Sequence, residues 1–333
     1  MRNETQKTIA GYYQKLRKLN KKLIKKQENS ERYEGSFQAE SIADEIRTLK
    51  EKVAWMLLEC GENEKALAIY KEMSWRTQGK IKYLGIGRAL TQMGLLAEAQ
   101  KLLEKGLKRF PGSVSIIVAI GNTYHDMGNY SKSLKHFELA LSIDPDDKLI
   151  LFSKANALYG LGLYEGAFPI YESLCKEYPD DPLFVTSLGY CYLNIDYPED
   201  AAKCFKAVMS NGYENDNIYN GLACAYLDMG LESDAIDTWK KGISKFPDPV
   251  LYRNLGISYF DCDWLSEAQD IVKEGLYRFP EDEELKELLE SIEEEINNPD
   301  DDTKPPIPLI MGLVAMSHVL RKRRGFDDRG NLR

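Results

Sequence analysis

The sequence repeats a pattern with a period of 34 residues, and this spacing constrains the fold more than any other feature. In residues 114–147 an apolar stripe at helical spacing ends at Gly128, and a second apolar stripe ends at Asp144-Pro145. The pattern predicts one helix, a tight turn and a second helix. Because neither helix can bury its stripe alone, we expect the unit to stack against copies of itself.

Small residues recur at two positions in each copy of this unit. They recur at steps of 34, and of 33 at either end of the series, where two helices are expected to cross closely. The first slot holds Ala54, Gly87, Gly121, Ala155, Gly189, Ala223 and Gly256. The second slot holds Ala66, Ala99, Ser133, Ala167, Ala201, Ala235 and Ala268. Prolines that end the second helix of a unit stand at Pro111, Pro145, Pro179, Pro247 and Pro280.

Together with Tyr124, Tyr192, Tyr226 and Tyr259 in an aromatic slot, these residues resemble the tetratricopeptide-repeat (TPR) family over about residues 47–282. The expected fold is an all-α, right-handed α-solenoid of about seven helix-turn-helix repeats with a C-terminal capping helix. The expected parts are a basic amphipathic N-terminal helix and lead-in helix (1–46), seven TPR-like repeats (47–282), a solvating cap helix (283–298), an acidic proline-rich linker (299–306) and an apolar-then-basic tail (307–333).

Residues 1–26 contain nine lysines and arginines and a single acidic residue, Glu4. Their apolar residues form one helical stripe, Ile9, Tyr12, Leu16, Leu19 and Leu23. Our preferred interpretation is a leading helix that packs its stripe on the first repeat. An anionic membrane, nucleic acid or a short coiled coil are alternative partners. Residues 29–36 are predicted to be a break, with a new helix near Gln38.

Several positions depart from the repeat. Gln78 stands where the first repeat should have its proline, which makes that boundary less defined. Pro169 falls inside a second helix and predicts a local kink beside Gly166. Asn211-Gly212 replaces a proline as a break signal.

The C-terminal region contains an acidic helix pattern followed by an apolar run. Leu285, Leu288, Leu289, Ile292 and Ile296 share one side of the pattern, as expected for a helix that caps the last repeat. The apolar residues of 307–320 surround a helix, and four cations follow at 321–324. This tail needs a cover, which could be the array's own surface, the groove of a second copy, or a membrane interface. We favour docking on protein, including self-association, over the membrane.

Other function classes find little support. We see no secretory leader and no run long enough to span a membrane, so we expect a cytoplasmic protein. Six scattered cysteines fit reduced, packed thiols, and neither they nor the three histidines predict a metal site, a catalytic triad or a cofactor. The glycines of 160–166 join two helices rather than follow a strand, which excludes a dinucleotide loop. Aromatic residues at repeat spacing indicate core packing, so nucleic acid is not an expected partner.

The TPR resemblance implies that the first helix of each repeat lines a concave groove in which ligands lie. The inward positions are Trp55, Arg88, Asn122, His125, Asn156, Tyr159, Tyr190, Asn220, Arg253 and Asn254. Asn122 and Asn156 share a slot, and their amides could donate to and accept from the backbone of an extended peptide. Simple solvated polar residues are an equal alternative. We therefore predict a non-catalytic scaffold or adaptor that binds a protein or peptide in this groove. The alternative is a peripheral membrane or assembly protein that works through its two ends.

Overall fold

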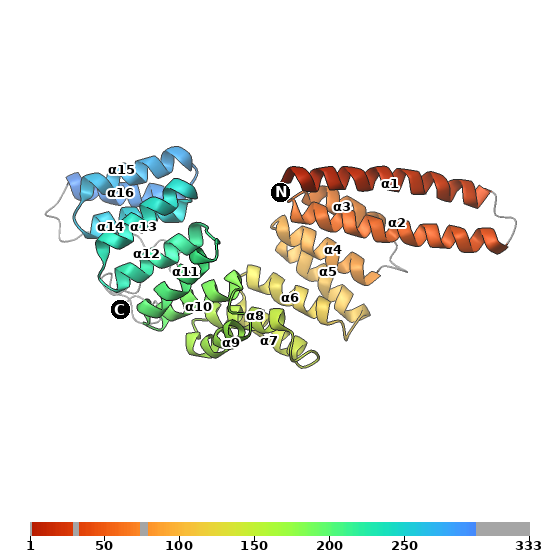
Figure 1. The fold of residues 1–333 in the computed structure, drawn as a ribbon, viewed down its shortest axis with the longest axis horizontal. Coiled ribbons are helices and arrows are strands. Elements are labelled where there is room, and N and C mark those ends of the chain that lie inside the picture. Colours follow the sequence, from red (N-terminus) through yellow and green to blue (C-terminus); the bar gives the residue numbers. More distant parts are fainter. Residues whose placement is uncertain (1, 29–32, 74–78, 298–333) are drawn as a thin grey trace. The chain divides into compact units, whose positions relative to one another are not determined.

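The computed structural model describes residues 2–28, 33–73 and 79–297. These residues form sixteen α-helices and no β-strand (Figure 1). The helices fall into two compact units, one ending at Leu161 and the other beginning at Gly162. The all-α architecture of stacked helix pairs agrees with the fold predicted from the repeat.

Unit 1 consists of a long helical hairpin followed by shorter helices. Each helix packs on the next one along the chain, as neighbours in a repeat array do. The helices are α1 (Arg2–Glu28), α2 (Tyr33–Glu59), α3 (Asn63–Glu72), α4 (Gly79–Gln92), α5 (Leu96–Arg109), α6 (Val114–Asp126), α7 (Tyr130–Leu141) and α8 (Lys148–Gly160).

The N-terminal helix uses its apolar stripe inside the protein. Ile9, Leu16 and Leu19 are buried in one core cluster with α2 and α3, and Tyr12 and Leu23 pack against that cluster. The described lysines and arginines of α1 are at least partly exposed. The expected packing of this stripe on the start of the array is confirmed.

Helix α2 differs from the prediction at its start. It begins at Tyr33 rather than near Gln38, and it runs to Glu59 without interruption. Residues 39–59 contain neither glycine nor proline, so nothing in this segment ends a helix. The expected lead-in helix and the first helix of the first repeat are therefore one continuous helix.

Small residues occupy the first slot because the two helices of a pair are in contact at that position. A Cβ atom on Gly121 of α6 would lie 2.6 Å from Cε1 of Phe137 on α7. The turn between these two helices places Gly128 at φ +70°, a conformation that side chains with a Cβ disfavour. Repetition of this hairpin explains why small residues recur in the sequence.

Unit 2 continues the same pattern. Its helices are α9 (Tyr164–Glu177), α10 (Pro182–Asn194), α11 (Pro198–Ser210), α12 (Asp216–Asp228), α13 (Glu232–Lys245), α14 (Pro249–Asp261), α15 (Leu265–Arg278) and α16 (Glu283–Asn297). Helix α9 remains a single element through Pro169. A turn at Gly212 precedes α12, whose N-terminus is capped by the side chain of Asn215.

Helix α16 closes unit 2 as the predicted cap. Leu285, Leu288 and Ile292 are fully buried against α14 and α15, and most of the glutamates of α16 remain in contact with solvent. Ile296, which we expected on the same apolar side, is 43% exposed because it lies in the last turn, beyond the surface that α14 and α15 offer. The linker and the tail predicted at 299–306 and 307–333 lie outside the described residues.

Among the helices in the described ranges, none is long and apolar enough to cross a membrane.

Candidate functional site

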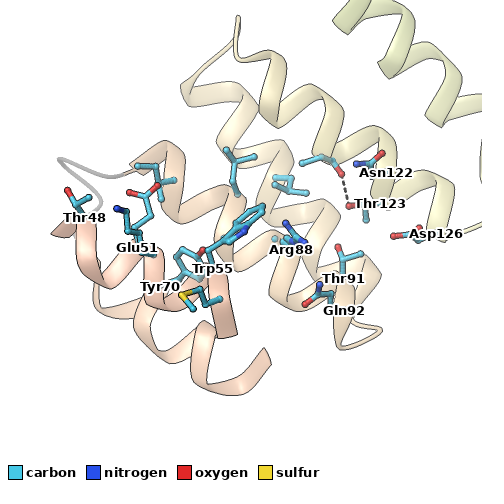
Figure 2. A pocket seen from close by; sticks show the side chains of 18 of the residues that line it. Thr48, Glu51, Trp55, Tyr70, Arg88, Thr91, Gln92, Asn122, Thr123 and Asp126 are labelled. Carbon is cyan, nitrogen blue, oxygen red and sulfur yellow. Dashed lines mark hydrogen bonds between the residues drawn. The ribbon is translucent and has the colours of Figure 1, made fainter. Parts of the chain in front are cut away.

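Three of the predicted groove residues meet in unit 1. Trp55 on α2, Arg88 on α4 and Asn122 on α6 occupy the same slot in successive repeats. All three line a cavity of about 980 Å³ (Figure 2). The wall is thus built by the first helices of three consecutive helix pairs, as the TPR resemblance implied.

The centre of the cavity is an exposed indole held by a cation. The guanidinium carbon of Arg88 lies 4.0 Å from the centroid of the Trp55 ring (Figure 2). Arg88 Nη2 also donates to Oε1 of Glu59 at 2.6 Å. Glu59 lies one turn after Trp55 on α2, so the arginine is fixed to two side chains of the neighbouring first helix. The indole is 49% exposed and remains available for contact.

The close packing of α3 and α4 beneath the cavity requires a glycine at position 85. Tyr70 of α3 is buried, and a Cβ atom on Gly85 of α4 would lie 2.2 Å from Cε1 of its ring. Any larger residue at position 85 would push α4 away from α3. Burial raises the pKa of the Tyr70 hydroxyl to about 12, with a further upward effect from the nearby carboxylate of Glu51. Half-buried Met56, Ile81 and Leu84 add apolar lining.

Polar groups surround this apolar floor. Asn122 is exposed on α6, and Asp126 follows it one turn later on the same side (Figure 2). The hydroxyl of Thr123 donates to the backbone oxygen of Ala119 at 2.8 Å, so its proton is used within the helix. The cavity therefore offers an apolar surface with side-chain amides and charges of both signs at its rim.

Several residues that line the cavity were not predicted from the repeat pattern. Glu51, Lys52, Thr91 and Gln92 line the cavity beside the predicted positions. Each lies three or four residues from Trp55 or Arg88, on the same helical face. The i±3 and i±4 spacing from the slot residues is the sequence signal that identifies them.

The other predicted residues of unit 1 do not line this cavity. His125 is half-buried, and its ring packs edge to face on Tyr130 with centroids 5.0 Å apart. Its Nδ1 lies 3.9 Å from Oδ1 of Asp126. Asn156 and Tyr159 are half-buried on α8.

Asn220 and Asn254 of unit 2 are buried, contrary to the expectation that they line an open groove. Oδ1 of Asn220 accepts from Nε1 of Trp239 at 3.0 Å and from Nδ2 of Asn254 at 2.7 Å. A buried amide needs such partners, and this pair supplies them across two repeats. The two asparagines connect first helices inside the core rather than present amides to a ligand.

Arg253 also differs from the expectation, because its side chain is buried and paired with Glu284 of the cap helix. Burial lowers the pKa of the guanidinium, while the charges of Asp282 and Asp248 oppose that shift. Tyr190 is half-buried, and its hydroxyl donates to the backbone oxygen of Asn217 at 2.6 Å.

The six cysteines are free thiols. Burial raises the pKa of Cys175 and Cys191 to about 12 and that of Cys204 to about 11, so these three thiols stay protonated at neutral pH. In the part of the chain that the structure describes, no three or more His, Cys, Asp or Glu side chains form a group that could hold a metal ion.

The repeated pairs of antiparallel helices define the chain as an α-solenoid repeat protein. Two tetratricopeptide-repeat family models match it, one over residues 118–147 and one over residues 150–181. Residues 118–147 and 150–181 therefore contain tetratricopeptide repeats. A comparison with curated proteins gives no match.

Solved structures share the fold. A crystal structure of the APC/C hetero-tetramer Cut9-Hcn1 matches 77% of this chain with a TM-score of 0.61 and 17% identity. This chain spans 52% of that one, about half its length. A tetratricopeptide repeat protein from Parabacteroides merdae matches 73% of this chain and 97% of its own, with a TM-score of 0.60 and 16% identity. The repeats support a general role as a protein–protein interaction scaffold.

Proposed function

We propose that this protein is a non-catalytic scaffold or adaptor, and that it binds an extended segment of a partner protein in the unit 1 cavity. The observation that carries the proposal is the exposed Trp55 indole, held by Arg88 at the centre of a cavity that three first helices line. An exposed aromatic ring that is already fixed loses little conformational freedom on binding, and such residues often dominate the energy of protein interfaces.

The lining indicates what such a segment would carry. A large apolar side chain fits against Trp55 and the half-buried floor residues. The amides of Gln92 and Asn122 offer donors and acceptors to the backbone of an extended peptide. Arg88 uses one donor on Glu59 and has further N–H groups for an acceptor on the ligand. The proposed partner is therefore a peptide with an apolar anchor residue. We propose that this protein binds it in the cytoplasm, the compartment expected from the sequence.

The second candidate, a peripheral membrane or assembly protein, has less support. A helix that lies in a membrane interface buries an apolar face in lipid. In α1 that face is occupied, because Ile9, Leu16 and Leu19 are buried against the rest of unit 1. The lysines of α1 would still be attracted to anionic surfaces.

The test has two stages and a matched control. Partners are first captured with the intact protein, and the affinity of one partner peptide is then measured by calorimetry. Trp55→Ala should weaken binding by roughly 2 kcal/mol or more, as expected for an aromatic anchor. The control is Trp264→Ala in unit 2, because Trp264 is also 49% exposed but lies outside the cavity. Equal affinity for wild type and Trp55→Ala would refute the proposal.

A further inference from the structure

The buried ring of Tyr70 carries a hydroxyl that helix packing does not require. Tyr70 of α3 packs on Gly85 of α4, where a Cβ atom would lie 2.2 Å from Cε1 of the ring. Phe205 of α11 makes the same contact in unit 2, because a Cβ atom on Gly221 of α12 would lie 2.3 Å from Cζ of its ring. Tyr70 and Phe205 stand in the same slot of their repeats, and both are buried. A ring without a hydroxyl therefore fills this position equally well.

The hydroxyl of Tyr70 opens on the unit 1 cavity. Tyr70 lines the cavity together with Trp55 (Figure 2). Among the described residues no group forms a hydrogen bond with this hydroxyl, and its oxygen is not one of the fully enclosed polar atoms that lack a partner. Its pKa is raised to about 12 by burial, so the hydroxyl keeps its proton at neutral pH. The cavity thus contains a hydrogen-bond donor that is available to a ligand.

The charges around this donor are balanced. The charged lining residues are two acids, Glu51 and Asp126, and two bases, Lys52 and Arg88. The charge of Glu51 raises the pKa of the Tyr70 hydroxyl and that of Arg88 lowers it, so charges of both signs act on it from nearby. A charged anchor would meet a like charge there and would lose its hydration against the apolar floor. The position beside Tyr70 therefore suits an anchor residue without net charge.

The polar groups at this position suit a side-chain tip that both accepts and donates. The Tyr70 hydroxyl donates and the Glu51 carboxylate accepts. A phenol hydroxyl offers one donor and two acceptor lone pairs, and its ring provides a large apolar surface for contact with the Trp55 indole. Side-chain amides have such a tip but a much smaller apolar surface. Phenylalanine, leucine and methionine have the surface but would bury the Tyr70 donor without a good acceptor.

We propose that the anchor residue of the partner is a tyrosine, and that the Tyr70 hydroxyl determines this specificity by donating to the phenol oxygen of that tyrosine. The phenol in turn donates to the carboxylate of Glu51. This inference rests on the proposed function, because it names the anchor that the unit 1 cavity selects beside Trp55.

The first test selects a phage-displayed library of random heptapeptides on the intact protein. We expect enrichment of peptides that share a tyrosine, and this enrichment should be lost on the Trp55→Ala variant. Enriched peptides that share phenylalanine, leucine or methionine in place of tyrosine would overturn the inference and leave the proposed function intact. Equal enrichment on wild type and Trp55→Ala would refute the unit 1 site itself, and the inference with it.

The second test is a double-mutant cycle with one selected heptapeptide and its analogue that has phenylalanine in place of the tyrosine. By calorimetry, the wild-type protein should bind the tyrosine peptide roughly tenfold more tightly, because the analogue leaves the Tyr70 donor unpaired. In Tyr70→Phe this preference should fall to about twofold or less, because the two hydroxyls act on each other. The same preference in both proteins would overturn the inference. The proposed function would still stand if Trp55→Ala weakened the binding of both peptides.

Tyr171→Phe is the matched control. Tyr171 occupies the same slot in α9 of unit 2, is as buried as Tyr70, and does not line the cavity. This variant should keep the wild-type preference for the tyrosine peptide, and loss of the preference in Tyr171→Phe would overturn the inference. Urea unfolding of Tyr70→Phe should match that of wild type, because Phe205 packs in the same position without a hydroxyl. A stability loss as large as the affinity loss would assign the hydroxyl a structural role and overturn the inference.

Discussion

The guanidinium of Arg88 stacks on the indole of Trp55 at 4.0 Å and thereby connects two first helices of successive repeats. A contact between partly exposed groups of this kind contributes about 0.5 to 1 kcal/mol to stability. Its larger consequence is geometric. The stacked guanidinium and the ion pair to Glu59 restrict how both side chains present themselves in the cavity.

Arg88→Ala should therefore affect binding more than folding. We expect a loss of about 1 kcal/mol or less in the free energy of unfolding, because Arg88 and Glu59 are both substantially exposed. The affinity for a partner peptide should fall by roughly 1 to 3 kcal/mol, since the indole loses its support and the site loses a donor. Urea unfolding and calorimetry on the same samples separate the two effects. A stability loss larger than the affinity loss would contradict this assignment.

Gly85→Ala should destabilise unit 1. The new methyl group would lie 2.2 Å from the buried ring of Tyr70, and an overpacked core typically loses about 1 to 3 kcal/mol. Gly11→Ala is the matched control, because a Cβ atom at Gly11 in α1 meets no atom within 4 Å. That change should stabilise by up to about 1 kcal/mol through helix propensity. Urea denaturation of both variants gives the comparison, and equal stability of the two would show that α4 can move freely.

The buried thiol of Cys191 should resist alkylation. Burial raises its pKa from 9.0 to about 12, so at pH 8 its thiolate fraction is roughly a thousandfold below that of an unfolded chain. Because the folded pKa lies above the unfolded one, the stability linked to this thiol is complete below pH 9. It is lost as the pH rises towards 12. Mass spectrometry of iodoacetamide labelling at Cys191, with and without urea, tests the rate. Equal rates in both conditions would contradict the burial.

Much of the fold followed from spacing alone. Because each repeat contacts only its neighbours, a period of 34 residues with small residues at helix crossings specifies the helix pairs and their stacking. The start of α2 was less predictable. A break was inferred from Asn29 to Ser36, but helix ends depend on local capping, and residues 33–36 are compatible with a helix that continues to Glu59.

The candidate site was only partly predictable. Trp55, Arg88 and Asn122 share one slot, so a single geometric rule placed all three at the cavity. Asn220 and Arg253 were expected in the groove because they stand at inward positions of their first helices, as the TPR resemblance implies. Their burial depends on Trp239 and on Glu284, which lie on other helices. Such pairings across repeats follow from three-dimensional packing, which periodicity does not encode.

A substitution in the cap helix tests whether a loss of stability at one end of the array stays confined to the neighbouring helices. Leu288 of α16 is fully buried against the last helix pair, and Leu288→Ala should cost about 2 to 5 kcal/mol at that end. Hydrogen exchange should show loss of protection in α14, α15 and α16 and little change in α4. Exposed Leu95→Ala serves as a control with a small effect on exchange. Equal loss of protection in α4 and α14 would contradict the nearest-neighbour picture of the repeat.

The two asparagines that share a slot, Asn122 and Asn156, should contribute unequally to binding. The sequence gives them the same weight, but only Asn122 is exposed and lines the cavity, while Asn156 is half-buried on α8. Asn122→Ala should weaken binding of a partner peptide by roughly 1 to 3 kcal/mol, because peptide groups buried on binding lose a partner. Asn156→Ala should change it by less than about 0.5 kcal/mol, as for a surface position outside the site. Calorimetry measures the affinity of both variants for the partner peptide, and circular dichroism verifies that both are folded. Similar losses for both asparagines would mean that the bound segment extends beyond the cavity along the first helices of unit 1.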